Sequence, residues 1–213
     1  MSGNANNPRR AYWLKTLHQW HWISSAIALV GMLLFSFTGI TLNHVAQLDK
    51  PPVIVNQTAQ LPAELQAHLL SLGEQYEQDE ILPPLPKTLQ DWTNKTLSVD
   101  ISNSLPEWSA RELYLSMQRP GGDAWLSISL RNGAVKYQDS NRGWIAYLND
   151  LHKGRYTGDV WVWFIDIIAV ACLLFSITGL LILKMHANNR PSTWPLVALG
   201  LLVPFLIAVV FIH

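Results

Sequence analysis

The sequence predicts an α-helical membrane protein with three transmembrane helices and a small α+β domain between the first two. Hydrophobic residues make up 49% of the 213 residues, and they gather in three long blocks. The first block has 20 predominantly apolar residues without a charge, at positions 23–42. This length is sufficient for a helix to cross a bilayer. The stretch between the first two blocks is polar, and its second half alternates between apolar and polar residues as strands do.

The three blocks divide the chain into six predicted parts. These are an N-terminal segment (1–21), a first transmembrane helix (22–43), an extracytoplasmic α+β domain (44–159), a second transmembrane helix (160–183), a short link (184–192) and a third transmembrane helix (193–212). We expect the first helix to be retained rather than cleaved, because no convincing small-residue cleavage site follows it.

Lysine and arginine near the helix ends predict the orientation, because short cytoplasmic segments carry an excess of these residues. The N-terminal segment holds Arg9, Arg10 and Lys15, the link holds Lys184 and Arg190, and neither contains an acidic residue. The domain at 44–159 holds 10 basic and 14 acidic residues. We therefore expect a multi-pass protein of the bacterial inner (cytoplasmic) membrane. Its N-terminus would be cytoplasmic, and its α+β domain and C-terminus would be periplasmic.

The polar domain has signals for one helix and several strands. Leucines at near-helical spacing predict a helix over 63–76. Alternating residues predict strands at 95–102, 111–118 and 124–130, and Asn132-Gly133 predicts a tight hairpin leading to 134–137. A short amphipathic segment over 147–152 would then return to the membrane, with Gly154 and Gly158 joining it to the second transmembrane helix.

A seven-residue repeat links the first two transmembrane helices. LLFSFTG at 33–39 returns as LLFSITG at 173–179. Small residues in such a motif permit close approach of another helix or of a flat macrocycle. Ordinary helix packing is the simpler interpretation. The macrocycle gains support because a histidine follows each copy, His44 five residues after Gly39 and His186 seven residues after Gly179.

Histidines at the helix ends are the strongest candidates for a functional site. Five of the seven flank the first two helices, namely His18, His21, His44, His152 and His186. The predicted topology brings His44 and His152 to the outer side, and it brings His186 to the inner side with His18 or His21. Haem b needs two imidazoles from different helices at similar depth. Histidines can also serve as interfacial anchors, and position alone does not separate the two roles.

Asp166 is a further candidate, because an acidic residue inside a membrane helix is by default a candidate for a functional role. It could orient an imidazole or move a proton. Alternatively, it is an acid near the interface that bonds a tryptophan such as Trp163. The chain has no nucleophile motif, phosphate-binding loop or dinucleotide fingerprint, and we expect no nucleic-acid partner.

Several segments together resemble the PepSY-associated transmembrane helix family, in its short three-helix branch. They are LHQWHW, LLFSFTGITLNH, GWIAYLNDLHKGR and the helix end SITGLLIL. Some members of this family resemble haem-b membrane ferric reductases that assist ferrous iron uptake. The resemblance implies a PepSY-like periplasmic domain. It also implies haem ligands at His44, His152 and His18, with His21 and His186 as further positions.

The leading hypothesis is an inner-membrane electron carrier with one or two haems b. Electrons would come from a quinol or a cytoplasmic reductase and pass outward to ferric iron or its chelates, which would make the chain a ferric reductase. A compact three-helix chain could complete its haem sites as a homodimer, surrounded by membrane lipid. The alternative is a haem-free membrane anchor or regulator whose periplasmic domain binds a partner protein.

Overall fold

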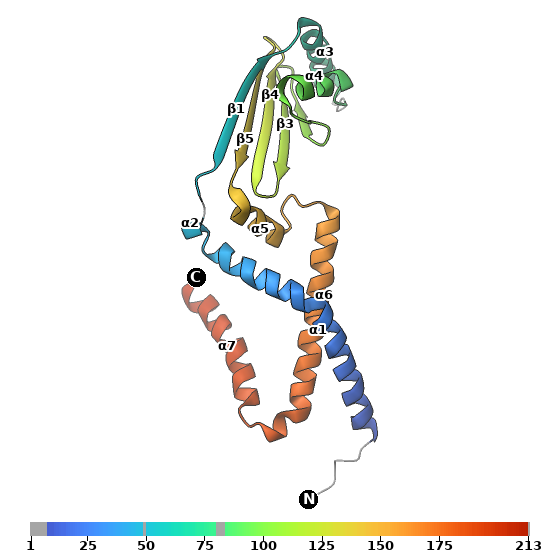
Figure 1. Ribbon diagram of the computed structural model, residues 1–213, viewed down its shortest axis with the longest axis vertical. Helices are drawn as coiled ribbons and strands as arrows, with labels where there is room; N and C mark the ends of the chain where they lie inside the picture. Colours follow the sequence, from blue (N-terminus) through green and yellow to red (C-terminus); the bar gives the residue numbers. More distant parts are fainter. Residues whose placement is uncertain (1–7, 49, 80–83, 213) are drawn as a thin grey trace, which may run out of the picture. The chain divides into compact units, whose positions relative to one another are not determined.

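A computed structural model describes residues 8–48, 50–79 and 84–212 of the chain (Figure 1). The chain divides into two compact units. We call Met1–Leu34 with Trp163–His213 the helical unit, and Phe35–Val162 the sheet unit. Two long helices, α1 (Pro8–Asn43) and α6 (Asp159–His186), contribute residues to both.

Among the described residues, three helices are long and apolar enough to cross a membrane: α1, α6 and α7 (Thr193–Phe211). A short 3₁₀ helix, η1 (Ala187–Asn189), precedes α7. This confirms three candidate membrane helices. The helix α1 begins at the first described residue rather than near residue 22, because helical backbone can continue beyond an apolar run. The predicted membrane boundaries therefore stay predictions.

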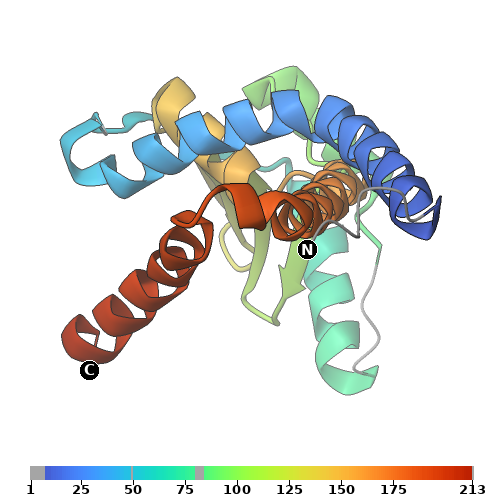
Figure 2. The same ribbon diagram turned by 90° about the horizontal axis from the view of Figure 1, so that it is seen from below.

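Within the helical unit, α1 and α6 lie side by side, and small residues permit their approach (Figures 1 and 2). Gly31 faces Ile168 so closely that an added Cβ would lie 2.7 Å from its Cγ2. Ala28 and Ala171 are buried in the same unit. The Arg10 guanidinium donates to the Met185 carbonyl at 3.1 Å. These contacts hold α1 against α6 in the unit that contains His18, His21 and His186.

The third helix makes little contact with the rest of the helical unit. Figures 1 and 2 both show α7 turning away from α1 and α6. Among its described side chains, only Thr193 is buried. Its apolar surface is thus available to lipid, as expected for a membrane helix.

The sheet unit is built on a five-stranded antiparallel sheet in the order β1-β5-β4-β3-β2. Its strands are β1 (Val53–Gln60), β2 (Leu105–Trp108), β3 (Glu112–Arg119), β4 (Gly122–Ser129) and β5 (Ala134–Asn141). Figure 1 shows α3 (Ala63–Asp79) and α4 (Lys87–Leu97) against one end of the sheet. Buried leucines of the sheet and both helices form the core, among them Leu69, Leu89, Leu113 and Leu126.

The sequence predicted part of this sheet correctly. The strands expected at 111–118 and 124–130 and the hairpin to 134–137 correspond to β3, β4 and β5, and α3 covers the helix expected at 63–76. The strand expected at 95–102 is wrong. The helix α4 runs to Leu97 there, and the chain turns at Ser98, whose φ is +57°. Val99 and Ile101 are buried without strand pairing, so their alternation signalled burial only.

A short helix, α5 (Gly143–Lys153), is bound tightly to the sheet. The Asp150 carboxylate accepts hydrogen bonds from the Gly121 amide at 2.9 Å and from the Arg142 guanidinium at 2.7 Å. The Arg142 amide donates to the Gly121 carbonyl at 2.9 Å. Gly121 has a φ of +71°, and an added Cβ would lie 2.8 Å from Tyr147 Cβ, so the turn requires glycine. This arrangement holds the helix that carries His152.

Candidate histidine sites

The first copy of the repeat surrounds His152 within the sheet unit. His152 Nδ1 lies 2.7 Å from Thr38 Oγ1. Its ring contacts Phe35 edge to face, with ring centroids 5.2 Å apart. Gly39 lies beside the ring, and an added Cβ would make an ordinary contact of 3.8 Å with His152 Cε1. We call Phe35, Thr38 and Gly39 with this ring the His152 cradle.

The second copy surrounds His21 in the same way within the helical unit. His21 Nδ1 lies 3.0 Å from Thr178 Oγ1 and 3.1 Å from the Phe175 carbonyl. The ring stacks on Phe175 with centroids 4.5 Å apart. An added Cβ on Gly179 would lie 3.2 Å from His21 Cε1. We call Phe175, Thr178 and Gly179 with this ring the His21 cradle. Equivalent residues of the repeat therefore hold one histidine each.

The carbonyl beside His21 determines which nitrogen of this ring carries the proton. His21 Nδ1 lies 3.1 Å from the Phe175 carbonyl, which can only accept, and Thr178 donates its own proton to the Leu174 carbonyl at 2.6 Å. Nδ1 of His21 therefore carries the proton, which leaves its Nε2 lone pair available to a metal. At His152, the 2.7 Å bond to Thr38 suits either tautomer.

The remaining three candidate histidines have the same tautomer as His21 for the same reason. The Nδ1 atoms of His18, His44 and His186 lie 2.7, 3.0 and 2.9 Å from the backbone carbonyl four residues earlier in their helices. A carbonyl oxygen can only accept, so Nδ1 is the donor. The four rings with a carbonyl partner thus offer Nε2 as a ligand atom when neutral, and an Nδ1 bond of this kind is typical of metal-binding histidines.

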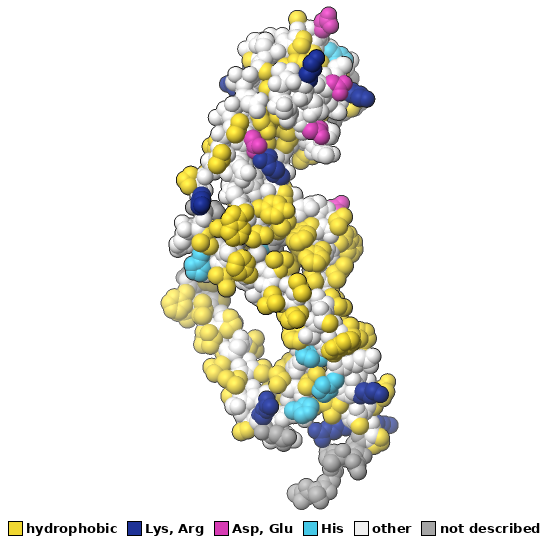
Figure 3. Space-filling model, viewed as in Figure 1, with side chains coloured by type: hydrophobic (Ala, Val, Ile, Leu, Met, Phe, Trp, Pro, Cys, Tyr) yellow, Lys and Arg dark blue, Asp and Glu magenta, His cyan; other side chains and the backbone are white. Residues whose placement is uncertain are grey.

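Three of the five histidines meet in the helical unit. The ring centroids of His18 and His186 are 6.3 Å apart, with ring planes at 89°. His18 and His21 line a groove of about 550 Å³ whose other wall is α6, from Phe175 to Leu183. Figure 3 shows histidines gathered beside hydrophobic and basic side chains in this unit. The sequence left the choice between His18 and His21 open. In the structure both lie at the groove, and His18 is the one whose ring contacts His186.

The centroid separation of His18 and His186 matches that of two imidazoles on opposite sides of one iron. Metal–imidazole bonds are about 2 Å long, so rings on opposite sides of one iron have centroids roughly 6 Å apart. The groove volume is also within the range of about 300–1,000 Å³ typical of cofactor sites. Its walls are mainly apolar side chains and the glycine of the repeat, which suits a flat hydrophobic macrocycle. Haem needs only two side-chain ligands. Groups of three or more His, Cys, Asp or Glu suited to a bare metal ion are absent from the described residues.

His44 and His152 are less closely arranged. His44 is exposed at the end of α1, while His152 is held in its cradle. Within the described part of the chain, no hydrogen bond or ring contact joins the two. The ends of their helices are connected nearby, because Thr41 Oγ1 donates to Asn149 Oδ1 at 2.8 Å. The pairing of His44 with His152 stays a prediction.

Asp166 is exposed on α6. Over residues 8–48, 50–79 and 84–212, the structure gives its carboxylate no hydrogen bond, to Trp163 or to any histidine. Both roles considered for it from the sequence stay predictions.

Sequence reasoning missed the residues that hold the histidines. It related each copy of the repeat to the histidine that follows it, His44 or His186. The structure instead places His152 and His21 against the two copies. The identical spacing of phenylalanine, threonine and glycine in the two copies was the available signal, since each of these residues lies against the ring.

A comparison with protein-family models decides the family. The PepSY_TM-like model matches residues 12–213. The chain belongs to the PepSY-associated transmembrane family. The match spans the candidate membrane helices, the sheet domain and all five candidate histidines. No curated protein and no solved structure matches the chain.

Proposed function

We propose that this PepSY-associated membrane protein is a haem-b electron carrier of the bacterial inner membrane. It would pass electrons outward to ferric iron or ferric chelates. The observation that carries the proposal is the inner histidine group. His18 and His186 stand at a centroid separation of 6.3 Å beside an apolar groove, and hydrogen bonds at Nδ1 leave Nε2 available on both rings.

His18 and His186 would be the axial ligands of an inner haem, with His21 in the wall of its groove. His44 and His152 would serve a second haem near the other end of α1. Haem b accepts and donates one electron without a change of protein ligand. The helix α1 carries His18 and His44 26 residues apart, which is roughly 39 Å of helix, so two haems would divide the crossing into shorter steps.

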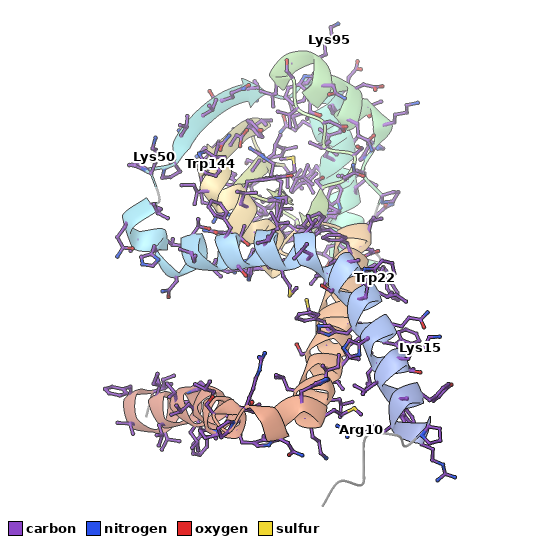
Figure 4. All side chains as sticks on the ribbon, turned by 60° about the horizontal axis from the view of Figure 1, so that its bottom comes forward. Arg10, Lys15, Trp22, Lys50, Lys95 and Trp144 are labelled. Atoms are coloured by element: carbon purple, nitrogen blue, oxygen red, sulfur yellow. The ribbon has the colours of Figure 1, made fainter. Side chains whose placement is uncertain are left out.

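The chain's own residues contribute orientation and a low-dielectric environment. Thr178 and Phe175 fix the His21 ring, and Gly179 lets the ring approach α6. The apolar residues of α6 along the groove exclude water and thereby tune the reduction potential of a bound haem. Arg10 and Lys15, both on the first turns of α1 (Figure 4), offer positive charge for haem carboxylates or for an electron donor.

The alternative is a haem-free anchor whose outer domain binds a partner protein. One observation favours it. Strand β1 is an edge strand without a charged residue, it pairs with β5 on one side, and its first residues Val53 and Ile54 are exposed. Exposed edges of this kind accept strands from other chains.

Electron transfer across proteoliposomes tests the proposal. The protein would be reconstituted with a reduced quinol inside and a ferric chelate outside, and formation of the ferrous complex would be followed over time. We expect His18→Ala to lower the rate at least tenfold, because it removes a ligand rather than a supporting contact. The control is His68→Ala, which removes an exposed histidine from α3.

The same assay separates the two functions. The electron carrier requires His44 and His152, so alanine at both should abolish ferric reduction. Equal rates for the wild type, the His18 variant and protein-free vesicles would refute the proposal. If the double variant also left the cellular function intact while substitutions in β1 abolished it, the chain would be the anchor.

A further inference from the structure

A hollow in the sheet unit lies between two segments that are far apart in the sequence. Its volume is about 270 Å³. One wall comes from the end of α2 (Val45–Leu48) and the start of β1, the other from the start of α5. The lining residues are Leu48, Lys50, Pro51, Val53, Asn141, Arg142, Gly143, Trp144 and Ile145. The hollow is separate from the histidine groove.

The outer face of α5 is unusually apolar for a surface in water. Trp144 is 64% exposed and Tyr147 is 46% exposed, and Val53 beside the hollow is 68% exposed. The opposite face of α5 buries Ala146, Asn149 and Asp150 against the protein. Figure 3 shows hydrophobic side chains gathered over α5 below the sheet. A short helix with exposed aromatic residues on one face is typical of attachment to a membrane surface.

The chain connects one wall of the hollow closely to a candidate membrane helix. The helix α1 ends at Asn43, and the first lining residue, Leu48, follows five residues later. Five residues span at most roughly 18 Å, even when fully extended. The hollow is therefore restricted to the region near the membrane surface, where lipid headgroups can reach it.

The segments next to the membrane helices also differ in net charge from the rest of the sheet unit. Residues 44–55 and 142–158 contain four basic and two acidic residues, a net charge of +2, whereas 56–141 contain six basic and eleven acidic residues, a net charge of −5. Arg142 is paired with Asp150 at 2.7 Å. The remaining charges are those of Lys50, Lys153 and Arg155 and of one acid, Asp49, which leaves a net charge of +2. Figure 4 shows Lys50 and Trp144 at the same end of the sheet, and Lys95 at the far end.

We propose that the hollow and the outer face of α5 bind anionic phospholipid. Trp144 and Tyr147 lie among the headgroups, where amphipathic aromatic rings are favoured. Lys50 lies at the hollow and attracts the lipid phosphate. The membrane-proximal end of the sheet unit is thereby seated on the bilayer, and the acidic end faces the aqueous phase.

Spin labels on the full-length protein in nanodiscs test this proposal. The native thiol is removed by Cys172→Ser, and one label is introduced at Trp144→Cys, at Tyr147→Cys, or at the distal control Lys95→Cys. Collision rates with oxygen, which partitions into lipid, are compared with those of a water-soluble nickel chelate. We expect positions 144 and 147 to favour oxygen and position 95 to favour the nickel chelate.

The lipid preference is measured by raising the fraction of phosphatidylglycerol in phosphatidylcholine nanodiscs. Nickel access at position 144 should fall as the anionic fraction rises. Lys50→Gln should raise the fraction needed for half of this effect about fivefold, since a basic residue near an anionic surface contributes about that factor. Nickel access equal to that of position 95 at both labelled sites would overturn the proposed seating. Lipid access without any response to phosphatidylglycerol would overturn the anionic preference.

Discussion

At the scale of single residues, the two threonines of the repeat differ in whether a second acceptor also bonds the same histidine nitrogen. Thr178 shares the Nδ1 proton of His21 with the Phe175 carbonyl. Thr38 Oγ1 is bonded to His152 Nδ1 at 2.7 Å, and no second acceptor contacts that nitrogen within the described residues. The same substitution should therefore have unequal effects at the two positions.

We predict that Thr38→Val weakens haem retention at the outer site by about tenfold or more, the usual cost of losing a partner of a metal-binding histidine. Thr178→Val should have a smaller effect, because the carbonyl of Phe175 remains and because His21 lines the groove rather than binding the iron. Haem retention in both variants is measured as the rate at which haem is released to apomyoglobin during dialysis. Thr16→Val is the matched control, since its hydroxyl bonds the Tyr12 carbonyl and contacts no histidine. Equal retention in all three variants would contradict the role given to the hydroxyls.

The glycines of the repeat predict a second asymmetry. A Cβ added at Gly179 would lie 3.2 Å from His21 Cε1, which requires the ring to move, whereas one at Gly39 would lie 3.8 Å from His152 Cε1, an ordinary contact. Gly179→Ala should thus shift the reduction potential of the bound haem, and Gly39→Ala should leave it unchanged. Potentiometric titration measures both variants. A shift confined to Gly39→Ala would contradict the assignment of the two cradles.

At the scale of elements, the attachment of α5 depends on one buried carboxylate. Asp150 pairs with Arg142 and accepts the Gly121 amide, and its side chain is only 4% exposed. Breaking a buried pair by removing one partner costs about 3–5 kcal/mol. We predict a loss of this size for Asp150→Ala in the free energy of unfolding of the sheet unit.

Urea unfolding followed by near-ultraviolet circular dichroism of the full chain measures this effect. Asp123→Ala is a suitable control, because Asp123 is exposed on the neighbouring strand β4. Similar unfolding midpoints for the two variants would show that the Asp150 carboxylate does not hold α5 to the sheet.

The elements that could be predicted from sequence are those with a strong local pattern. Uncharged apolar runs indicated α1, α6 and α7, and alternation with turn residues indicated β3, β4 and β5. Strand β1 was missed because only its first half is apolar and two prolines precede it. Its pairing with β5, from Val53–Asn141 to Gln60–Ala134, joins residues more than 70 positions apart. Short sequence patterns do not predict a contact between residues so far apart.

At the scale of the whole molecule, the sequence identified the candidate histidines but not how each is held. Counting from the helix ends was sufficient to group His18, His21 and His186. The partners of His21 and His152 depend on how α1 and α6 approach each other and on how α5 is bound to the sheet. Contacts such as that of Gly31 with Ile168 determine that approach, and they are properties of pairs of helices rather than of either sequence alone.

The distribution of basic residues predicts the sidedness of the molecule. On a Cys172→Ser background, Lys95→Cys in the sheet unit should react with a membrane-impermeant maleimide in intact cells. Arg190→Cys, in the short link between α6 and α7, should react only after the membrane is permeabilised. Labelling of Arg190→Cys in intact cells with protection of Lys95→Cys would reverse the orientation and the direction of electron flow.

The absorption spectrum of the purified wild-type protein tests the central claim most directly. If the histidine groups bind haem b, the oxidised protein has a Soret band that sharpens and shifts on reduction with dithionite, with distinct α and β bands typical of two imidazole ligands. Haem quantified against protein should reach one or two per chain. A preparation from haem-replete cells that folds correctly but shows no Soret band, before or after reduction, would contradict the account.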